Sequence, residues 1–196
     1  TYTNSYGTLR QTEYSSVSIA DEQEAYRAVM ELHKNGHSRI AALTADPDDS
    51  SISQLRYLGY LRALHELGLK PREGDLICAA DFTIATAYNT MRERLRSPAD
   101  FTAVFAIADD MAIGAMRALR ESGRSIPEDC SVIAIDGINV SEYIHPMLTT
   151  LCQPMAAMGD TSVEILLDMI EGRGGNRHVT LPTTLRAGQS VRDLTK

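Results

Sequence analysis

Short apolar runs alternate with longer amphipathic segments along most of the chain. The apolar runs are rich in Val, Ile and Ala, and they show little in–out alternation, as expected of strands that are covered on both faces. They occupy residues 15–20, 38–45, 75–81, 101–108, 130–136 and 178–187. We therefore predict a strand at each of these six positions.

Between the apolar runs, hydrophobic residues recur at helical spacing. Asp21 is a suitable N-cap for a helix that ends near Asn35, because Gly36 follows. Four further helices are predicted from the apolar faces Leu55–Leu58–Leu64–Leu67, Ile84–Tyr88–Met91–Leu95, Ile113–Met116–Leu119 and Ile165–Leu166–Met169–Ile170. Strand and helix alternate five times, which predicts an α/β fold with a doubly wound parallel sheet and helices on both faces.

Composition narrows the class of protein. The 196 residues are 43% hydrophobic and 23% charged, which is typical of one or two globular units. No apolar run reaches 18 residues, so we expect no membrane-spanning helix. The 19 Lys and Arg against 26 Asp and Glu give a net charge of -7. Because phosphate binding needs a basic surface, this chain is not expected to contact DNA itself.

The three cysteines, Cys78, Cys130 and Cys152, stand far apart. Their odd number and wide spacing argue against a disulfide framework and against a zinc site of the CxxC type. Cys78 and Cys152 lie in apolar runs, where a thiol is expected to pack as a small hydrophobe. The first residues, TYTNSYGTLRQ, lack the pattern of a signal peptide. Together these features predict a reducing, cytoplasmic location.

Acids and one aromatic residue follow the predicted strands, where ligands bind in parallel α/β sheets. They are Phe82, Asp109, Asp136 and the acidic segment 46–50, with Arg56 in the first turns of the next helix. Carboxylates accept hydrogen bonds from hydroxyls, an arginine donates to them, and an aromatic face packs on the C–H side of a sugar. The set predicts a site for a polyhydroxylated small molecule.

Each of these residues also has a structural interpretation. Asp109 directly precedes a helix, so an N-cap is favoured for it. Phe82 could equally close the edge of the sheet, and Arg56 taken alone is typical of a solvated charge on a helix. For Asp136 a functional role is favoured, because Gly137 begins a loop and the carboxylate therefore has no helix to cap.

Catalytic and metal-binding motifs are absent: the sequence contains no GxSxG, HExxH, Walker A or GxGxxG. The acidic segment resembles half a calcium loop, but Ser51 stands where such a loop needs glycine. His33 and His37 are separated by Gly36 and suit the end of a helix, where a basic side chain interacts favourably with the dipole. We expect no metal, no cofactor and no enzymatic activity.

Four long strings resemble the effector-binding domain of LacI/GalR-type bacterial transcription regulators. They are NGHSRIAALTA, SSISQLRYLGYLRAL, FTAVFAIADDMAIGAMRALRESGRSIPEDCSVIAIDG and YIHPMLTTLCQP. The resemblance runs in order from Val17 to Arg186. It implies a periplasmic-binding-protein-like fold of two lobes joined by three crossovers, with the effector between them. It also implies a homodimer and an upstream DNA-binding helix-turn-helix headpiece, which this chain does not contain.

The resemblance also implies how the lobes divide the chain. Residues 1–18 would hold the end of the N-terminal lobe, with its last strand in TYTNSYG, and the first crossover. Residues 19–148 would form the C-terminal lobe. Residues 149–173 would hold the second crossover and a helix of the N-terminal lobe, and residues 174–196 would return. The chain is thus expected to be mainly the C-terminal lobe with part of the N-terminal lobe.

Effector contacts of the family fall on identifiable residues. Arg56 matches an arginine that holds effector hydroxyls or acidic groups, and Phe82 matches an aromatic that stacks on the ligand ring. Asp136 matches the first acid of the motif usually written FDD. Asp109 matches the acid of the ANDxxA stretch. Among effectors, the resemblance favours sugars over sugar phosphates and purines.

At the remaining positions of the site, the sequence matches the family's pattern in one loop and departs from it at two residues. Ser50 and Ser53 lie in the loop that often contributes hydroxyls. Ala108 replaces the usual asparagine, which removes a side-chain amide from the pocket. Gly137 replaces the second acid of FDD. The first departure bears on which ligand is bound, more than on whether the site exists.

Three functions are compatible with the sequence at this point. The first is a sensor whose effector changes DNA binding by the headpiece. The second is a periplasmic-type sugar-binding transport receptor, which would need a secretion signal in place of the headpiece. The third is an enzyme that uses Asp109 and Asp136 as an acid–base pair, which the missing nucleophile and cofactor motifs disfavour. The apolar stripe of the last helix further predicts self-association.

Overall fold

A six-stranded sheet forms the centre of the molecule, of which the computed structural model describes residues 2–4, 7–9, 14–46 and 51–196. The strand order is β10-β8-β7-β6-β4-β5. The strands are β4 (Ile40–Ala45), β5 (Leu76–Ala79), β6 (Ala103–Ala106), β7 (Ser131–Asp136), β8 (Thr149–Cys152) and β10 (Thr184–Arg186). Neighbours run parallel except β10, which pairs antiparallel with β8. The predicted α/β class with a mostly parallel sheet is confirmed.

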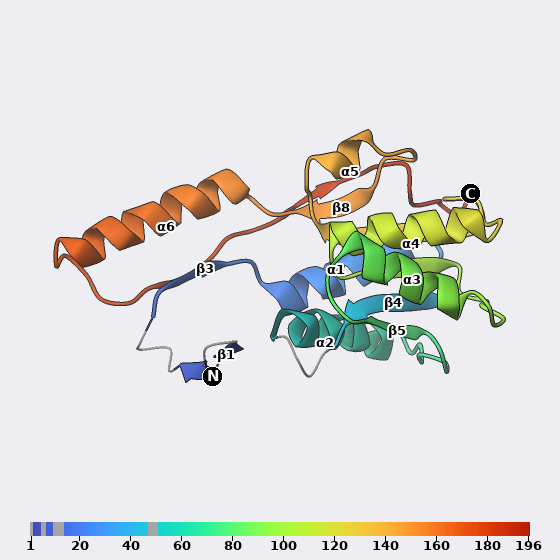
Figure 1. The fold of residues 1–196 in the computed structure, drawn as a ribbon, viewed down its shortest axis with the longest axis horizontal. Coiled ribbons are helices and arrows are strands. Elements are labelled where there is room, and N and C mark those ends of the chain that lie inside the picture. Colours follow the sequence, from blue (N-terminus) through green and yellow to red (C-terminus); the bar gives the residue numbers. More distant parts are fainter. Residues whose placement is uncertain (1, 5–6, 10–13, 47–50) are drawn as a thin grey trace.

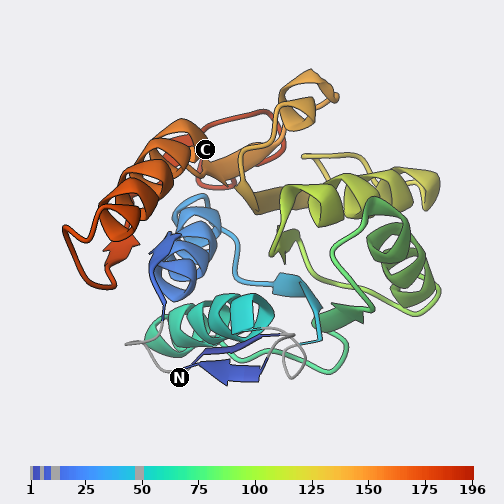
Figure 2. The ribbon, with the colours of Figure 1, turned by 60° about the vertical axis from the view of Figure 1, so that its left-hand side comes forward.

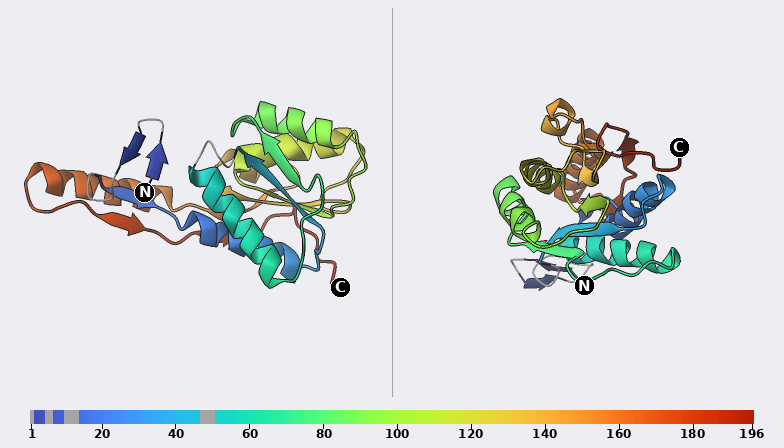
Figure 3. Two further views of the ribbon diagram at one scale, coloured as in Figure 1. Left: turned by 90° about the horizontal axis from the view of Figure 1, so that it is seen from below. Right: turned by 90° about the vertical axis from the view of Figure 1, so that its right-hand side faces the viewer.

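Two pairs of helices cover the sheet. Figure 3 shows α1 (Asp21–Lys34) and α2 (Ser51–Glu66) on one side, and α3 (Ile84–Arg94) and α4 (Asp109–Glu121) on the other. Within each pair the backbones approach closely. A Cβ on Gly59 would collide with the carbonyl of Glu22, and one on Gly114 with the carbonyl of Ile84. Only glycine allows helices to pack at such distances.

A narrow arm extends from this body, as Figures 1 and 2 show. It contains β3 (Ser16–Ser18), β9 (His178–Thr180) and the 16-residue helix α6 (Met155–Ile170). β3 and β9 pair in parallel as a separate two-stranded ribbon. Near the N-terminus, β1 (Tyr2–Asn4) pairs antiparallel with β2 (Gly7–Leu9), and the short helix α5 (Val140–Tyr143) follows β7.

Three strand predictions need correction. Residues 15–20 form a strand, but it lies in the arm and not in the main sheet. The run 178–187 is two strands, β9 and β10, because residues 181–183 carry the chain from the arm to the edge of the main sheet. The expected single strand in TYTNSYG is instead divided between β1 and the start of β2.

The predicted inner face of α2 is also wrong in part. Leu58 is 45% exposed, whereas Arg56 and Tyr60 are buried. The helix is rotated about its axis so that the charged Arg56 faces inward. Hydrophobic spacing cannot predict this rotation, because it depends on an ion-pair partner for that charge. Similarly, Asp21 is the first residue of α1 and Ala20 is its N-cap, without a side-chain capping bond.

Among the cysteines, Cys130 is buried and Cys152 half-buried, but Cys78 is exposed. Cys78 lies on β5, an edge strand in which buried and exposed residues alternate. The prediction that Cys78 packs in the interior is therefore wrong. Across the described ranges, no helix is both long and apolar enough to span a bilayer.

His37 joins the core to the C-terminal tail. Its Nδ1 lies 3.0 Å from Thr102 Oγ1 and its Nε2 3.2 Å from the carbonyl oxygen of Arg192. A neutral ring satisfies both, with Nε2–H donating to the carbonyl and Nδ1 accepting from the hydroxyl. His37 is 2% exposed and its ring contacts Thr102 and Arg192, so its interpretation as a basic side chain that interacts with the dipole at a helix end was wrong. His33 does lie in the last turn of α1, as expected.

Burial lowers the pKa of His37 below its ordinary value of 6.5. Because the unfolded chain then binds the proton more tightly than the folded protein, stability is complete above about pH 6.5 and falls as the pH drops toward the lowered folded pKa. We expect the urea midpoint to be lower at pH 5.5 than at pH 7.5. The His37→Gln variant should lose part of this pH dependence; an identical dependence in the variant would contradict the assignment.

Candidate functional site

The carboxyl edge of the sheet brings an arginine and two aspartates together. Arg56, on the second turn of α2, is only 4% exposed. Its Nε donates to Asp21 Oδ1 at 2.8 Å, and one terminal nitrogen lies 3.3 Å from Asp136 Oδ1 and donates to the carbonyl of Ile107. The guanidinium therefore joins the start of α1, the end of β6 and the end of β7.

Asp136 ends β7 with its side chain 24% exposed. Gln153 Nε2 donates to its Oδ1 at 2.7 Å, and the Asp109 backbone N–H approaches its Oδ2 at 3.4 Å. Burial raises the pKa of the Asp136 carboxyl, while Arg56 and Gln153 oppose this. The residue has φ of 142°, a conformation that residues with a side chain rarely adopt. Such strain is typically kept where function requires a side chain to point in one direction.

Asp109 lies close to Asp136 and is fully buried. Its Oδ2 accepts hydrogen bonds from the backbone N–H of Gly137 at 3.1 Å, that of Ile138 at 3.0 Å, and Ser141 Oγ at 2.7 Å. Its Oδ1 accepts from Thr150 Oγ1 at 2.5 Å. The expected N-cap role is wrong, since Ala108 is the N-cap of α4. Asp109 instead fixes the loop after β7, which carries Asp136.

The other expected site residues lie apart from this cluster. Phe82 follows β5, is half-buried and packs against the hydrophobic core. It stands at the same edge of the sheet as Asp136, but β6 and β4 separate the two strands. Ser53 is fully buried on α2, and Ser50 falls outside the described residues. The structure thus brings Arg56 to Asp136 and places Phe82 on the same edge.

Two members of the cluster were missed from the sequence. Asp21 was assigned to helix capping, and Gln153 received no role. Gln153 follows β8 just as Asp136 ends the neighbouring β7, so the rule that strand ends carry the site would have found it. Within the described residues, no group of three or more His, Cys, Asp or Glu side chains is arranged to hold a metal ion.

Residues 29–191 match the family model of the periplasmic binding protein-like domain. The chain belongs to this family. It is 37% identical over 172 residues to the HTH-type transcriptional regulator MalR of Clostridium butyricum, covering 88% of this chain and 51% of MalR. It is 34% identical to the repressor CytR of Escherichia coli K12, covering 82% and 47%. The chain therefore spans about half the length of these relatives.

Solved structures of family members show the same arrangement. A CelR–cellobiose complex superimposes with a TM-score of 0.85 at 33% identity, covering 93% of this chain and 55% of that one. A LacI-family regulator from Enterococcus faecium with bound ribose gives 0.82 at 33% identity, covering 92% and 66%. The resemblance to LacI/GalR-type regulators and the periplasmic-binding-protein-like fold are confirmed.

One departure from the family motif has a clear structural reason in this periplasmic-binding-protein-like domain. Gly137, where FDD has its second acid, has φ of 74°. A Cβ there would lie 2.5 Å from Cys152 Sγ and 2.6 Å from Cys152 Cα. An aspartate would be strained and would collide with β8. The other departure, Ala108, is 5% exposed at the N-terminus of α4.

Proposed function

We propose that this chain is the effector-sensing part of a LacI-type transcription regulator, and that it binds a small sugar at the carboxyl edge of its sheet. One observation carries the proposal: Arg56, Asp136 and Gln153, from three separate elements, meet at the strand ends, with Asp136 in a strained conformation. A carboxylate between an arginine and an amide is suited to accept hydrogen bonds from ligand hydroxyls. Cellobiose and ribose in the structural neighbours support a sugar.

The proposed roles follow from position. Asp136 would accept ligand hydroxyls, Arg56 would donate to ligand oxygens, and Phe82 would pack against the ring. Ser50 would contribute a hydroxyl, whereas Ser53, expected from the sequence to do the same, is fully buried and is not proposed as a contact. Asp109 would act through the loop that it holds and would not touch the ligand, because its two oxygens already accept four hydrogen bonds.

The arm supports the expected division into lobes. We propose that 19–148 form the C-terminal lobe, that 1–18 and 149–173 contribute crossovers and the end of an N-terminal lobe, and that 174–196 return. Within 149–173, β8 (Thr149–Cys152) still belongs to the main sheet, so the second crossover would begin after it. The effector would shift the angle between lobes by its differential affinity for two states. Operator DNA would be bound only by a helix-turn-helix outside these residues, in the cytoplasm.

The two rival functions receive less support. The relatives are transcriptional regulators, which favours the sensor over a transport receptor. An acid–base pair of Asp109 and Asp136 would need Asp109 to reach a substrate, but this carboxylate is fully buried. We therefore propose that the protein is neither a transport receptor nor an enzyme, and that it needs no cofactor.

Calorimetric titration of the natural full-length protein with cellobiose and D-ribose, followed by a wider panel of sugars and nucleobases, tests the proposal. For the sugar that binds, Asp136→Ala should weaken affinity at least tenfold, about 1.4 kcal/mol, without unfolding the domain. Asp110→Ala, an exposed neighbour of the cluster, is the control. Unchanged affinity in Asp136→Ala would remove this residue from the site, and a purine or phosphate ligand with no sugar bound would overturn the sugar assignment.

We further propose a homodimer in which the outer face of α6 takes part. Val163, Leu166 and Ile170 are 57%, 56% and 72% exposed on this helix. Contiguous apolar surface of this kind favours association. Sedimentation velocity at about 20 µM should detect a dimer or larger species, and Ile170→Asp should shift it to monomer. Thr161→Asp, a change on the same helix outside this apolar face, is the control. A monomeric wild type would contradict the prediction.

A further inference from the structure

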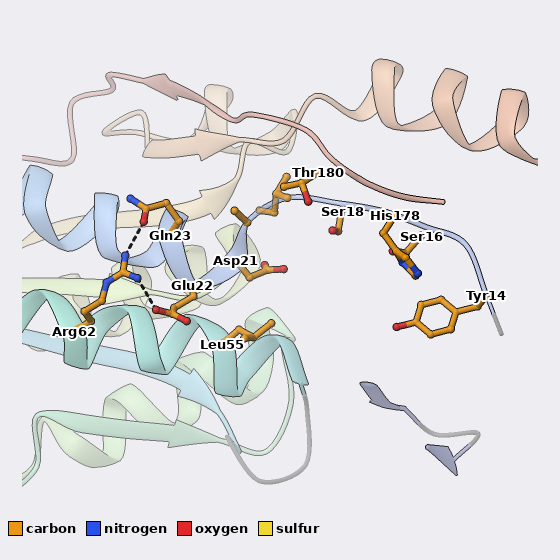
Figure 4. Close-up of a pocket in the computed structure, with 12 residues that line it drawn as sticks. Tyr14, Ser16, Ser18, Asp21, Glu22, Gln23, Leu55, Arg62, His178 and Thr180 are labelled. Carbon is orange, nitrogen blue, oxygen red and sulfur yellow. Dashed lines mark hydrogen bonds and ion pairs between the residues drawn. The ribbon is translucent and has the colours of Figure 1, made fainter. Parts of the chain in front are cut away.

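A cavity lies between the β3–β9 ribbon and the first turn of α1, shown in Figure 4. Its volume is about 360 Å³, within the range of roughly 300–1,000 Å³ that is usual for ligand pockets. Of the cluster at the sheet edge, only Asp21 lines it; Arg56 and Asp136 do not. We call this space the ribbon cavity and define it by Ser16, Ser18, His178, Thr180 and Asp21.

One wall of the ribbon cavity is uniformly polar. The parallel register places Ser16 beside His178 and Ser18 beside Thr180. Because side chains alternate along a strand, all four lie on one face of the ribbon, and all four line the cavity. Val17, between the two serines, alternates to the other face; it lines a small pocket together with Ile165 of α6, the helix that packs against β3. The ribbon thus separates an apolar contact with α6 from a surface of hydroxyls and an imidazole.

The polar wall is ordered by its own contacts. Ser16 Oγ lies 2.8 Å from His178 Nδ1. The ring of Tyr14 stands edge-on to that of His178, with centroids 5.0 Å apart and planes at 81°. Figure 4 shows Tyr14, His178 and Ser16 gathered at one end of the cavity. Hydroxyls and imidazole can each donate or accept, so the wall can match groups that do both.

On the opposite wall, the charges are already paired. Glu22 Oε1 lies 2.6 Å from an Arg62 nitrogen, and Gln23 accepts from the same guanidinium at 2.7 Å. Asp21 is held by Arg56 at 2.8 Å. Leu55 adds an apolar contact from α2. A charged ligand would have to break one of these pairs, whereas a neutral one would leave them intact.

We propose that the ribbon cavity is a second ligand site, for a small uncharged polyhydroxylated molecule of the size of a monosaccharide. The ligand would hydrogen-bond to Ser18, Thr180 and the Ser16–His178 pair while resting against Leu55. Because it would contact both strands of the ribbon and the helices of the body, it would hold the arm at one angle to the body. This inference does not depend on the sheet-edge site.

Nuclear magnetic resonance of the 196-residue chain tests the proposal. D-Ribose, D-glucose and myo-inositol are each titrated to 50 mM while the His178 ring and the amides of 16–18 and 178–180 are observed. We expect at least one probe to give saturable shifts at these positions. D-Glucose 6-phosphate should bind no more tightly than D-glucose. The absence of saturable shifts with all three neutral probes, or tighter binding of the phosphate, would overturn the proposal.

Matched variants locate the binding. Thr180→Val removes one hydroxyl at constant shape and should weaken binding at least fivefold; Ser18→Ala gives an independent test on the other strand. Thr184→Val, the same change on exposed β10 outside the cavity, should have no effect. Asp136→Ala should leave these shifts intact even where it abolishes sheet-edge binding. If Asp136→Ala abolishes them and Thr180→Val does not, the probe occupies the sheet edge and the ribbon cavity is not a site.

Discussion

Replacing Asp109 with alanine should lower the free energy of unfolding by about 3 kcal/mol, because the change leaves four buried or half-buried donors without their acceptor. Three of them, the Gly137 and Ile138 amides and the Ser141 hydroxyl, share one carboxylate oxygen, and Thr150 occupies the other. The loop after β7 would lose its anchor at the same time, so Asp136 would lose its fixed direction.

Urea denaturation monitored by circular dichroism measures this loss. Asp110→Ala, one residue further along α4 and exposed, is the matched control and should change stability by less than about 0.5 kcal/mol. A loss below 1 kcal/mol in Asp109→Ala would mean that the four donors find other partners, and would contradict the anchoring role.

Replacing Arg56 with alanine should have an effect of similar size on stability and a larger one on binding. The change leaves the Asp21 and Asp136 carboxylates without their shared cation, and breaking a buried ion pair in this way costs about 3–5 kcal/mol. Affinity for the sheet-edge ligand should fall at least a hundredfold. Arg62→Ala, on the same helix but with a half-exposed ion pair, should cost less than about 1 kcal/mol.

The Arg56→Ala variant should also respond to pH in a defined direction. Burial already raises the pKa of Asp136, and loss of Arg56 removes a charge that lowers it. A folded-state pKa above the unfolded value means that the folded variant binds a proton more tightly than the unfolded chain. The loss in free energy of unfolding relative to the wild type should therefore be largest at pH 7 and shrink as the pH falls through the raised pKa. Denaturation at pH 7 and pH 5 measures this, and an equal deficit at both would contradict the role of Asp136.

The sequence was most informative where strands are buried on both faces. The runs around Ile40, Val104 and Ile133 are mainly apolar, and they form the central strands of the sheet. From the rule that ligands bind at strand ends, we expected Arg56 and Asp136 to lie at the same edge of the sheet, and they do. What failed depended on partners distant in sequence: Asp109 is held by groups up to 41 residues away, and no local pattern contains Thr150.

The helix faces illustrate the same limit. Periodicity places Met116 and Leu119 of α4 correctly in the core. On α2 the same reasoning placed Leu58 inside, although the helix turns to bring Arg56 to Asp21. An ion pair between two helices is invisible to hydrophobic spacing. Likewise, periodicity did not show that residues 15–20 and 178–187 contribute to an arm separate from the main sheet.

The pairing of Ser16 with His178 sets an order for assembly. Closing a loop of about 160 residues is entropically costly, so contacts between the two ends of a chain form after the local ones. The β4-to-β8 part of the sheet can form before β9 (His178–Thr180) has been synthesised, but the ribbon cannot. The face of α6 that carries Ile165, which packs toward the ribbon, is therefore synthesised before β3 and β9 have paired. During this interval that apolar face is exposed, and the nascent chain is more prone to aggregate.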